Sequence, residues 1–308
     1  MRVFLAGATG VIGRPLVPAL LAAGHEVIAM CRSAESAEQA RAAGAEAAMA
    51  DALDAGAVQD AVAQARPDAI VNQLTALPKR IDPRRMEREF AQNDRLRSEG
   101  APILAGAARE AGAKLIAQSI AFMYEAGAPG TLHAEGDPLV LDPPPAFART
   151  ANAVKTLERA TLDAGGTVLR YGYFYGPHSS IAPDGAIVAD LHRRRMPIVG
   201  SGAGVWSFIH VDDAAAATVK ALTAPAGVYN VVDDDPAPVS QWLPALAQAA
   251  GAPRPMRVPA FLAKLLAGDY GVTIMTRSQG ASNERAKGEL GWEPAHRSWR
   301  EGFAAALA

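Results

Sequence analysis

The sequence predicts an α/β fold in which a doubly wound parallel sheet carries helices on both faces and a smaller lobe follows. Short apolar strands alternate with alanine-rich helical stretches through the first half of the 308 residues. Beyond Tyr171 the composition changes, and glycine, proline and aromatic residues become frequent. We therefore expect a main domain over residues 1–171 and a substrate-binding lobe over 172–308, interleaved with the main domain near 206–232.

Each element is predicted from an apolar run bounded by glycine, proline or polar residues. We expect strands over residues 1–6, 25–30, 45–49, 69–72, 113–119 and 167–171. We expect helices over 13–24, 35–43, 55–65, 84–111 and 150–164, with an interruption near 100–102 and a C-terminal stop at Gly112. The prolines within 142–145 predict a loop, and the lobe is expected to contain helices over 212–222 and 284–290.

The first strand-to-helix turn has the spacing of a dinucleotide-binding site. It contains three glycines three residues apart and the residues between them: Gly7, Thr9, Gly10, Val11, Ile12 and Gly13. Such glycines let the backbone approach a pyrophosphate, and the N-terminus of the next helix offers unpaired N–H groups to its negative charge. The alternative is a tight turn whose glycines only relieve backbone strain. Because the motif lies inside a strand–helix–strand unit, we interpret it as a Rossmann-type cofactor site.

Composition excludes several classes of partner. A net charge of −2 gives no long-range attraction to nucleic acid or anionic lipid, and we expect neither as a partner. The only cysteine, Cys31, excludes an intrachain disulfide and suggests a reducing compartment. The sequence shows no apolar run of membrane-spanning length and no signal peptide. We therefore expect a soluble, cytoplasmic protein that acts on a small molecule.

A series of short motifs resembles the extended, epimerase/dehydratase-like branch of the short-chain dehydrogenase/reductase superfamily. In chain order they are the glycine turn, Asp51, Asn93, Gln118-Ser119, 169–171 with 175–177, 208–213 and 290–294. The resemblance covers nearly the whole chain and implies an NAD(P)-binding Rossmann domain. It further implies a set of residues around the cofactor: Asp51, Ala52 and Leu53 at the adenine, Leu74 and Thr75 near a ribose, and Asn93, Ser119 and Tyr171 toward the catalytic edge of the sheet.

The end of the second strand favours NADP(H) over NAD(H). A site that prefers NAD places a carboxylate there to bind the ribose 2′-OH. This chain has Met30 and Cys31 at that place, followed by Arg32 and Ser33. A guanidinium makes charge-assisted hydrogen bonds to a 2′-phosphate, and a serine hydroxyl can add another. The alternatives are that Arg32 stacks on the adenine or points to solvent, and that NAD(H) is bound instead.

The catalytic pattern of the resembled family is incomplete in this chain. The family uses a tyrosine as the proton donor, a lysine four residues later and a serine that orients the substrate oxygen. Lys155 is present, but Ala151 stands four residues before it, and a match shifted by one residue to fit Glu158 puts Thr150 there. At the serine position the chain has Ile120, with Ser119 one residue earlier. An acid must therefore come from elsewhere, or the reaction must not need one.

Four residues are candidates for the catalytic role: Tyr124, Tyr173, Lys155 and His178. If the segment stays extended, Tyr173 shares one face with Tyr171 and Tyr175, and a cation such as Lys155 would lower the pKa of a nearby phenol. The alternative for each tyrosine is that it lines the pocket or bonds to the backbone. His178 follows a Gly-Pro turn and could act as an acid or base, or make only a polar contact.

The substrate is expected to be small and largely apolar. Sugar-nucleotide enzymes of the resembled branch carry an arginine and an aspartate where this chain has Trp206 and Ser207. Trp206 offers a flat apolar wall instead of a charge. We expect four residues to line this pocket: Phe122, Met123, Tyr175 and Trp206.

The remaining histidines are interpreted as structural. His210 lies in an apolar run and is expected to be a satisfied core residue, and Asp212 and Asp213 are expected to cap the following helix. The spacing of the other four, at 25, 133, 192 and 296, does not match metal-ligand patterns, and we predict no metal.

These observations favour an NADP(H)-dependent reductase of a small molecule with an activated C=C, C=N or C=O group. One alternative is an isomerase, epimerase or lyase that retains its cofactor without net redox change. Another is a non-catalytic dinucleotide-binding sensor. The helix expected over 150–164 is a candidate homodimer interface, although its pattern equally fits internal packing.

Overall fold

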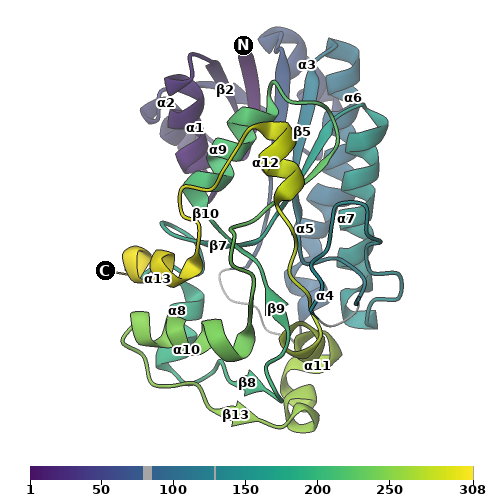
Figure 1. Ribbon diagram of the computed structural model, residues 1–308. Helices are drawn as coiled ribbons and strands as arrows, with labels where there is room; N and C mark the ends of the chain where they lie inside the picture. The colour runs from purple at the N-terminus through teal and green to yellow at the C-terminus, as the bar shows by residue number, and fades with distance from the viewer. Residues whose placement is uncertain (79–84, 128–129, 308) are drawn as a thin grey trace.

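The computed structural model describes residues 1–78, 85–127 and 130–307. Its main body is a parallel sheet of seven strands in the order β11-β6-β5-β4-β1-β2-β3 (Figure 1). The strands are β1 Arg2–Ala6, β2 Glu26–Cys31, β3 Glu46–Met49, β4 Ala69–Asn72, β5 Lys114–Ile120, β6 Thr167–Tyr171 and β11 Val228–Val231. All pair in parallel, and β4 and β6 are buried along their whole length because helices cover both faces. The predicted fold class is confirmed.

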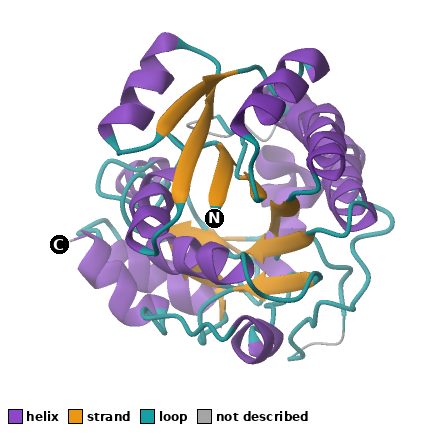
Figure 2. Cartoon of the chain, turned by 90° about the horizontal axis from the view of Figure 1, so that it is seen from above, coloured by secondary structure: helices purple, strands orange, loops and turns teal. Residues whose placement is uncertain are grey.

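Two groups of helices cover the sheet, one on each face (Figures 1 and 2). On one face lie α1 Gly13–Ala22, α2 Ala34–Ala42, α9 Val211–Ala221 and α12 Glu284–Leu290. On the other lie α3 Ala55–Ala65, α6 Ala101–Ala111 and α7 Pro145–Asp163. Each group presents its apolar residues to the sheet, and the two resulting cores hold the strands in place.

Two boundaries differ from the prediction. The long helical stretch divides into α4 Met86–Glu89, α5 Ala91–Arg95, a π-helical turn η1 over Leu96–Gly100, and α6, so the interruption begins four residues before Gly100. Helix α7 begins at Pro145 rather than at residue 150. A proline fits the first helical turn because its missing N–H has no intrahelical partner there, so the predicted loop ends earlier than expected. Gly112 ends α6 at φ 63°, as predicted.

The lobe consists of short strand pairs and four helices below the sheet in Figure 1. Strand β7 Tyr173–Tyr175 pairs with β10 Phe208–His210, β8 Ile198–Val199 with β13 Arg257–Val258, and β9 Val205–Trp206 with β12 Ala237–Pro238. Its helices are α8 Ala186–His192, α10 Val239–Ala249, α11 Ala260–Thr276 and α13 Trp299–Leu307. Buried aromatic residues form its core, and α9, β11 and α12 carry the chain back to the main body. No helix within the described ranges is long and apolar enough to cross a membrane.

Candidate active site

The glycine turn at the end of β1 leaves its backbone open at one position. A Cβ on Gly13 would lie 2.1 Å from the carbonyl oxygen of Gly7, and a Cβ on Gly7 would lie 2.7 Å from that of Gln73. Gly10 is exposed, and a Cβ there would meet only the Gly7 oxygen, at 3.3 Å. Packing therefore requires Gly7 and Gly13, whereas the space beside Gly10, at the start of α1, fits a pyrophosphate.

The neighbours of these glycines divide between surface and core. Thr9 and Val11 are half-buried beside Gly10. The side chain of Ile12 is 3% exposed and packs in the core beneath α1, so only its backbone can face a ligand. The turn thus fits a dinucleotide through backbone groups rather than through side chains.

The end of β2 presents a free cation. Arg32 is exposed, and among the described residues its guanidinium makes no hydrogen bond or ion pair. Ser33 caps α2: its Oγ accepts a hydrogen bond from the N–H of Ser36 at 3.2 Å and donates one to the Ser36 hydroxyl at 3.1 Å. Cys31 is buried, and burial raises the pKa of its thiol. Arg32 is therefore the group available to a phosphate here.

The ends of β3 and β4 carry the residues expected near the adenine and ribose. Asp51 is exposed, and its Oδ1 accepts a hydrogen bond from the N–H of Leu53 at 3.0 Å. Among the described residues its other oxygen accepts no hydrogen bond. Ala52 is buried. Leu74 is half-buried and Thr75 is exposed just after β4. Asn93 is fully buried, and its Oδ1 accepts a hydrogen bond from the N–H of Ala76 at 3.2 Å, which ties α5 to this loop.

A buried ion pair replaces the expected serine and lysine chemistry at β5 and α7. The Arg170 guanidinium donates to both carboxylate oxygens of Glu158, at 2.9 and 2.6 Å, and Ser119 Oγ donates to Glu158 at 2.6 Å. Ser119 is thus directed into α7. Lys155 is half-buried, and in the described part of the chain its ammonium has no partner.

The candidate phenol of Tyr124 belongs to the same network. Its hydroxyl donates to Asn230 Oδ1 at 2.6 Å and accepts from Arg170 at 2.9 Å, while the ring stacks on His133. Burial raises the pKa of Tyr124 although Arg170 opposes the shift. This hydroxyl therefore links the loop after β5 to Asn230 and Arg170.

The three alternating tyrosines do not all share one face, because the segment does not stay in one strand: Tyr171 packs in the core of the main body, whereas Tyr173 and Tyr175 pack in that of the lobe. The Tyr171 hydroxyl is buried against Thr218 Oγ1, 2.6 Å away, and accepts a hydrogen bond from Gln73 at 3.1 Å, and burial raises its pKa to about 12. The chain then leaves the main sheet at Gly172, so the alternation is broken. Tyr175 packs edge-on against Phe303 in the core of the lobe and has no exposed surface to offer a ligand.

Tyr173 lies instead in a stack of three aromatic rings beside the carboxyl end of β5. Its ring centroid is 4.2 Å from that of Phe122 and 3.9 Å from that of Trp206. Trp206 is fixed by a hydrogen bond from its Nε1 to the carbonyl oxygen of Ile274 at 2.9 Å. Met123 is buried behind the stack. Phe122, Tyr173 and Trp206 therefore form an aromatic wall at the edge where parallel strands bind their ligands.

Burial raises the pKa of both candidate phenols, Tyr124 and Tyr173. The pKa of Tyr173 lies well above the ordinary value, and the nearby Tyr270 raises it further. Lys155 is not among the groups that shift the pKa of Tyr173, so the condition under which it would make Tyr173 an acid is not met. His178 is exposed in a loop at φ 64°.

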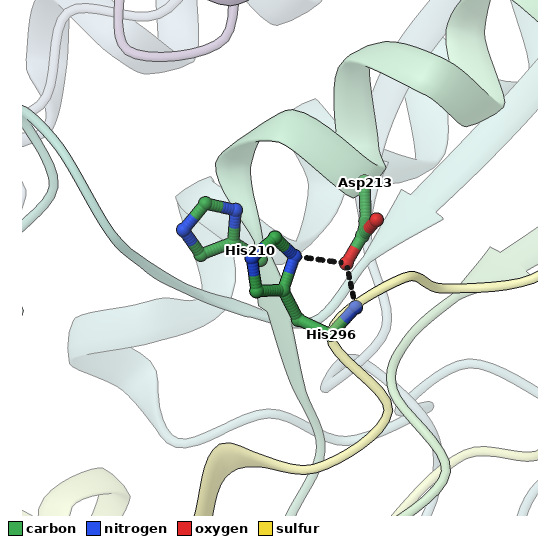
Figure 3. Close-up of side chains that lie close together, drawn as sticks. All are labelled: His210, Asp213 and His296. Carbon is green, nitrogen blue, oxygen red and sulfur yellow. Dashed lines mark hydrogen bonds and ion pairs between the residues drawn. The ribbon is translucent and has the colours of Figure 1, made fainter. Parts of the chain in front are cut away.

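A cluster that the sequence did not predict lies at the start of α9 (Figure 3). His210, rather than Asp212, caps this helix, because its Nδ1 accepts a hydrogen bond from the N–H of Asp212 at 3.2 Å. Asp213 accepts hydrogen bonds from the N–H groups of Ala295 and His296, both at 2.9 Å, and its carboxylate lies 3.0 Å from the His296 ring nitrogen.

This cluster fixes the C-terminal segment rather than a metal. The ligand atoms of His210, Asp213 and His296 lie within 4.8 Å of one another. The two imidazole rings, however, stack at 3.8 Å with 23° between their planes, so their lone pairs do not converge on one point. No residue spacing in the sequence signals the link between Asp213 and His296, which are 83 residues apart.

Comparison with known proteins agrees with this geometry. Residues 3–232 match the model of the NAD dependent epimerase/dehydratase family. The chain is 49% identical over 98% of its length to the 3-diazoavenalumate denitrifying reductase of a Streptomyces species, of which 99% is covered. It is 29% identical over 78% of its length to an uncharacterized protein of Schizosaccharomyces pombe, of which 78% is covered.

Solved structures of the same fold bind nicotinamide dinucleotides. The Thermus thermophilus UDP-glucose 4-epimerase in complex with NAD superposes with a TM-score of 0.74 at 25% identity, covering 100% of this chain and 98% of the epimerase. The human epimerase family protein SDR39U1 with NADPH gives 0.73 at 21% identity, covering 100% and 99%.

The fold and the cofactor cleft define a Rossmann-type, nicotinamide-dependent enzyme of the extended short-chain dehydrogenase/reductase class. The chain belongs to the NAD-dependent epimerase/dehydratase family and is an NAD(P)-dependent oxidoreductase.

Proposed function

We propose that this enzyme is an NADPH-dependent reductase of a small aromatic molecule that carries a diazonium group. The name of the Streptomyces relative, 49% identical over nearly the whole chain, specifies a 3-diazo compound and a denitrifying reduction. The observation that carries the proposal is that the cleft has an aromatic wall but no hydroxyl prepared for proton transfer. Reduction of a diazonium group does not need a proton donor, and in this it differs from reduction of the C=C, C=N and C=O acceptors expected from the sequence.

The cofactor is held by the glycine turn and by Arg32. The exposed backbone beside Gly10 fits the pyrophosphate, and the unpartnered guanidinium of Arg32 favours the 2′-phosphate of NADPH over the 2′-hydroxyl of NADH. A charge-assisted hydrogen bond of this kind contributes about 1.5–3 kcal/mol.

When bound, the dinucleotide would supply a hydride and be oxidised in turn. At the carbon that carries the diazonium group, this hydride forms a C–H bond as the C–N bond breaks. Dinitrogen leaves with the electron pair of the C–N bond. Since dinitrogen leaves as a neutral molecule and no alkoxide develops, the chain does not need a general acid. Its residues need only hold the acceptor ring against the cofactor and exclude water.

The aromatic wall suits such an acceptor. Tyr173 lies between Phe122 and Trp206, and Trp206 also packs on Trp242, so a planar substrate can stack on the outer face of Phe122 and against the edges of the other two rings. The faces of these rings are electron-rich and attract a positively charged diazonium group.

The test measures the loss of NADPH absorbance with an arenediazonium salt, an enone, an iminium salt and a ketone, each against a protein-free control. We expect oxidation above the background with the diazonium salt, together with one dinitrogen released per NADPH, measured by mass spectrometry with a nitrogen-15 label. Turnover of the ketone or enone alone would contradict the proposal. Tightly retained cofactor that is never consumed would favour the isomerase.

A further inference from the structure

A buried arginine in the π-helical turn has no hydrogen-bond partner. Arg97 is 4% exposed, and in the described ranges its guanidinium donates no hydrogen bond and lies in no ion pair. Burial lowers its pKa to about 10, so the group stays charged at neutral pH. A guanidinium has five N–H donors, and burying them without acceptors is unfavourable. The free protein therefore contains a buried cation that lacks a hydrogen-bond acceptor among the described residues.

The carboxylates that face Arg97 are already engaged by other groups. Glu158 is bound by Arg170 and Ser119. Asp94 Oδ2 accepts a hydrogen bond from Thr150 Oγ1 at 3.2 Å and lies 3.7 Å from Arg149, while its Oδ1 is buried without a hydrogen-bond partner. Within the described residues neither carboxylate makes a hydrogen bond to Arg97.

Tyr270 lies within electrostatic range of Arg97. The ring of Tyr270, on α11 of the lobe, stacks on Phe147 of α7 at 3.8 Å, and within the described chain its hydroxyl makes no hydrogen bond. Burial raises the pKa of Tyr270 and Arg97 opposes the shift, while Tyr270 adds to the raised pKa of Tyr173, so Tyr270 lies within electrostatic range of both residues. Within the described ranges the Tyr173 hydroxyl also makes no hydrogen bond, and its ring belongs to the aromatic wall.

We propose that the Arg97 guanidinium, with the Tyr270 hydroxyl, binds a carboxylate of the substrate while the aromatic wall holds the substrate ring. A guanidinium pairs with a carboxylate through two parallel hydrogen bonds, and a protonated phenol adds a third. The substrate class is therefore an aromatic carboxylic acid. This inference rests on the proposed function, because it takes the ligand at Arg97 to be the substrate and not the cofactor.

The test compares the binding of trans-cinnamate and of its neutral amide to the NADP⁺-loaded full-length protein by calorimetry. We expect the wild type to bind the acid at least about tenfold more tightly than the amide. The reason is that losing one charge-assisted contact costs about 1.4 kcal/mol or more. Arg97→Met should remove this preference, and Tyr270→Phe should reduce it about threefold to tenfold. Arg95→Met changes an exposed arginine two residues away and should leave it intact.

Two further measurements separate this role from others. NADPH affinity should stay within about twofold in Arg97→Met, because the carboxylate belongs to the substrate. A loss of NADPH affinity without a loss of acid preference would place a cofactor oxygen at Arg97 and overturn the proposal. So would equal binding of acid and amide by the wild type.

The stability of the variant distinguishes a ligand-binding arginine from a structural one. Since Arg97 has no partner in the free protein, Arg97→Met should keep its thermal midpoint near that of the wild type. Strong destabilisation with unchanged acid preference would overturn the proposal. Failure of diazonium turnover with retained acid preference would contradict only the proposed reaction.

Discussion

The three glycines of the first turn have different physical roles, although the sequence shows them as equivalent. Gly7 adopts φ 94° against the backbone of Gln73, and Gly13 packs on the Gly7 carbonyl. A Cβ on Gly10 would meet only the Gly7 oxygen, at 3.3 Å, a tight contact that a shift of a few tenths of an ångström relieves. The spacing predicted a cofactor site at this turn, but it does not show which glycines are required by packing and which lies at the surface.

The glycine roles lead to a paired prediction. Gly10→Ala should fold with a free energy of unfolding within about 1 kcal/mol of the wild type and bind NADPH at least about tenfold more weakly, because the methyl group occupies the pyrophosphate space. Gly13→Ala should lose about 3 kcal/mol of stability or more, since its Cβ cannot approach a backbone oxygen so closely. Urea unfolding and NADPH titration check both. Equal stability of the two variants would contradict this assignment.

A second prediction concerns Arg32. Arg32→Glu should weaken NADPH binding by about 10- to 100-fold while NADH binding changes little, because a carboxylate repels the 2′-phosphate and accepts hydrogen bonds from a 2′-hydroxyl. Arg41→Glu on α2 makes the same charge change at an exposed position and serves as the control. Fluorescence titration with both nucleotides measures the preference. If the two variants lose NADPH affinity equally, the loss comes from long-range electrostatic repulsion and not from direct recognition of the 2′-phosphate by Arg32.

At the scale of elements, the ion pair of Glu158 and Arg170 holds α7 against β6. Both side chains are 6% exposed, and the guanidinium meets the carboxylate through two hydrogen bonds. The apolar periodicity was enough to predict α7, the surrounding strands and the end of α6 at Gly112. It was not enough to predict the start at Pro145 or the π-helical turn, because both depend on tertiary packing rather than local preference.

Breaking this pair should be costly. Glu158→Gln should lower the free energy of unfolding by about 3–5 kcal/mol, because it leaves the Arg170 charge buried without its counter-ion. Glu293→Gln removes an exposed carboxylate that pairs with Arg297 and should cost less than about 1 kcal/mol. Chemical denaturation at neutral pH compares them. Similar losses in the two variants would show that burial does not decide the strength of the pair.

At the scale of the whole molecule, the cluster of His210, Asp213 and His296 ties the C-terminal segment to the main body (Figure 3). Burial lowers the pKa of His210, and the neighbouring His296 lowers it further, whereas Asp212 and Asp213 oppose the shift. A histidine with a lowered pKa binds fewer protons in the folded state than in the unfolded state. Stability therefore falls as the pH drops below the unfolded pKa of about 6.5.

The corresponding variant is His210→Asn, which keeps an acceptor at the helix N-cap but does not titrate. Its free energy of unfolding should fall less than that of the wild type between about pH 7 and 5, by up to about 1.4 kcal/mol per pH unit. Urea denaturation across this range measures the slopes. Parallel curves for the two proteins would show that His210 does not control the acid response.

The organisation into a main body and a lobe shows where sequence reasoning reached its limit. Trp206 was predicted to offer a flat wall to a ligand from its place before 208–213, but its ring is buried between Tyr173 and Trp242, so its contact with a ligand stays a prediction. Arg97 and Tyr270 were not predicted as site residues. They lie 173 residues apart in the sequence, Arg97 in η1 of the main body and Tyr270 in α11 of the lobe. The homodimer through α7 stays a prediction: its outer face borders a groove of about 510 Å³ with α5 and η1.

The most direct test of the central claim follows deuterium into the product of an arenediazonium reduction. With NADPH deuterated at nicotinamide C4 in ordinary water, we predict deuterium at the carbon that carried nitrogen. With ordinary NADPH in heavy water, the same carbon should carry no deuterium. Deuterium taken from the solvent would show that the chain delivers a proton to this carbon, and would contradict reduction by hydride without an acid.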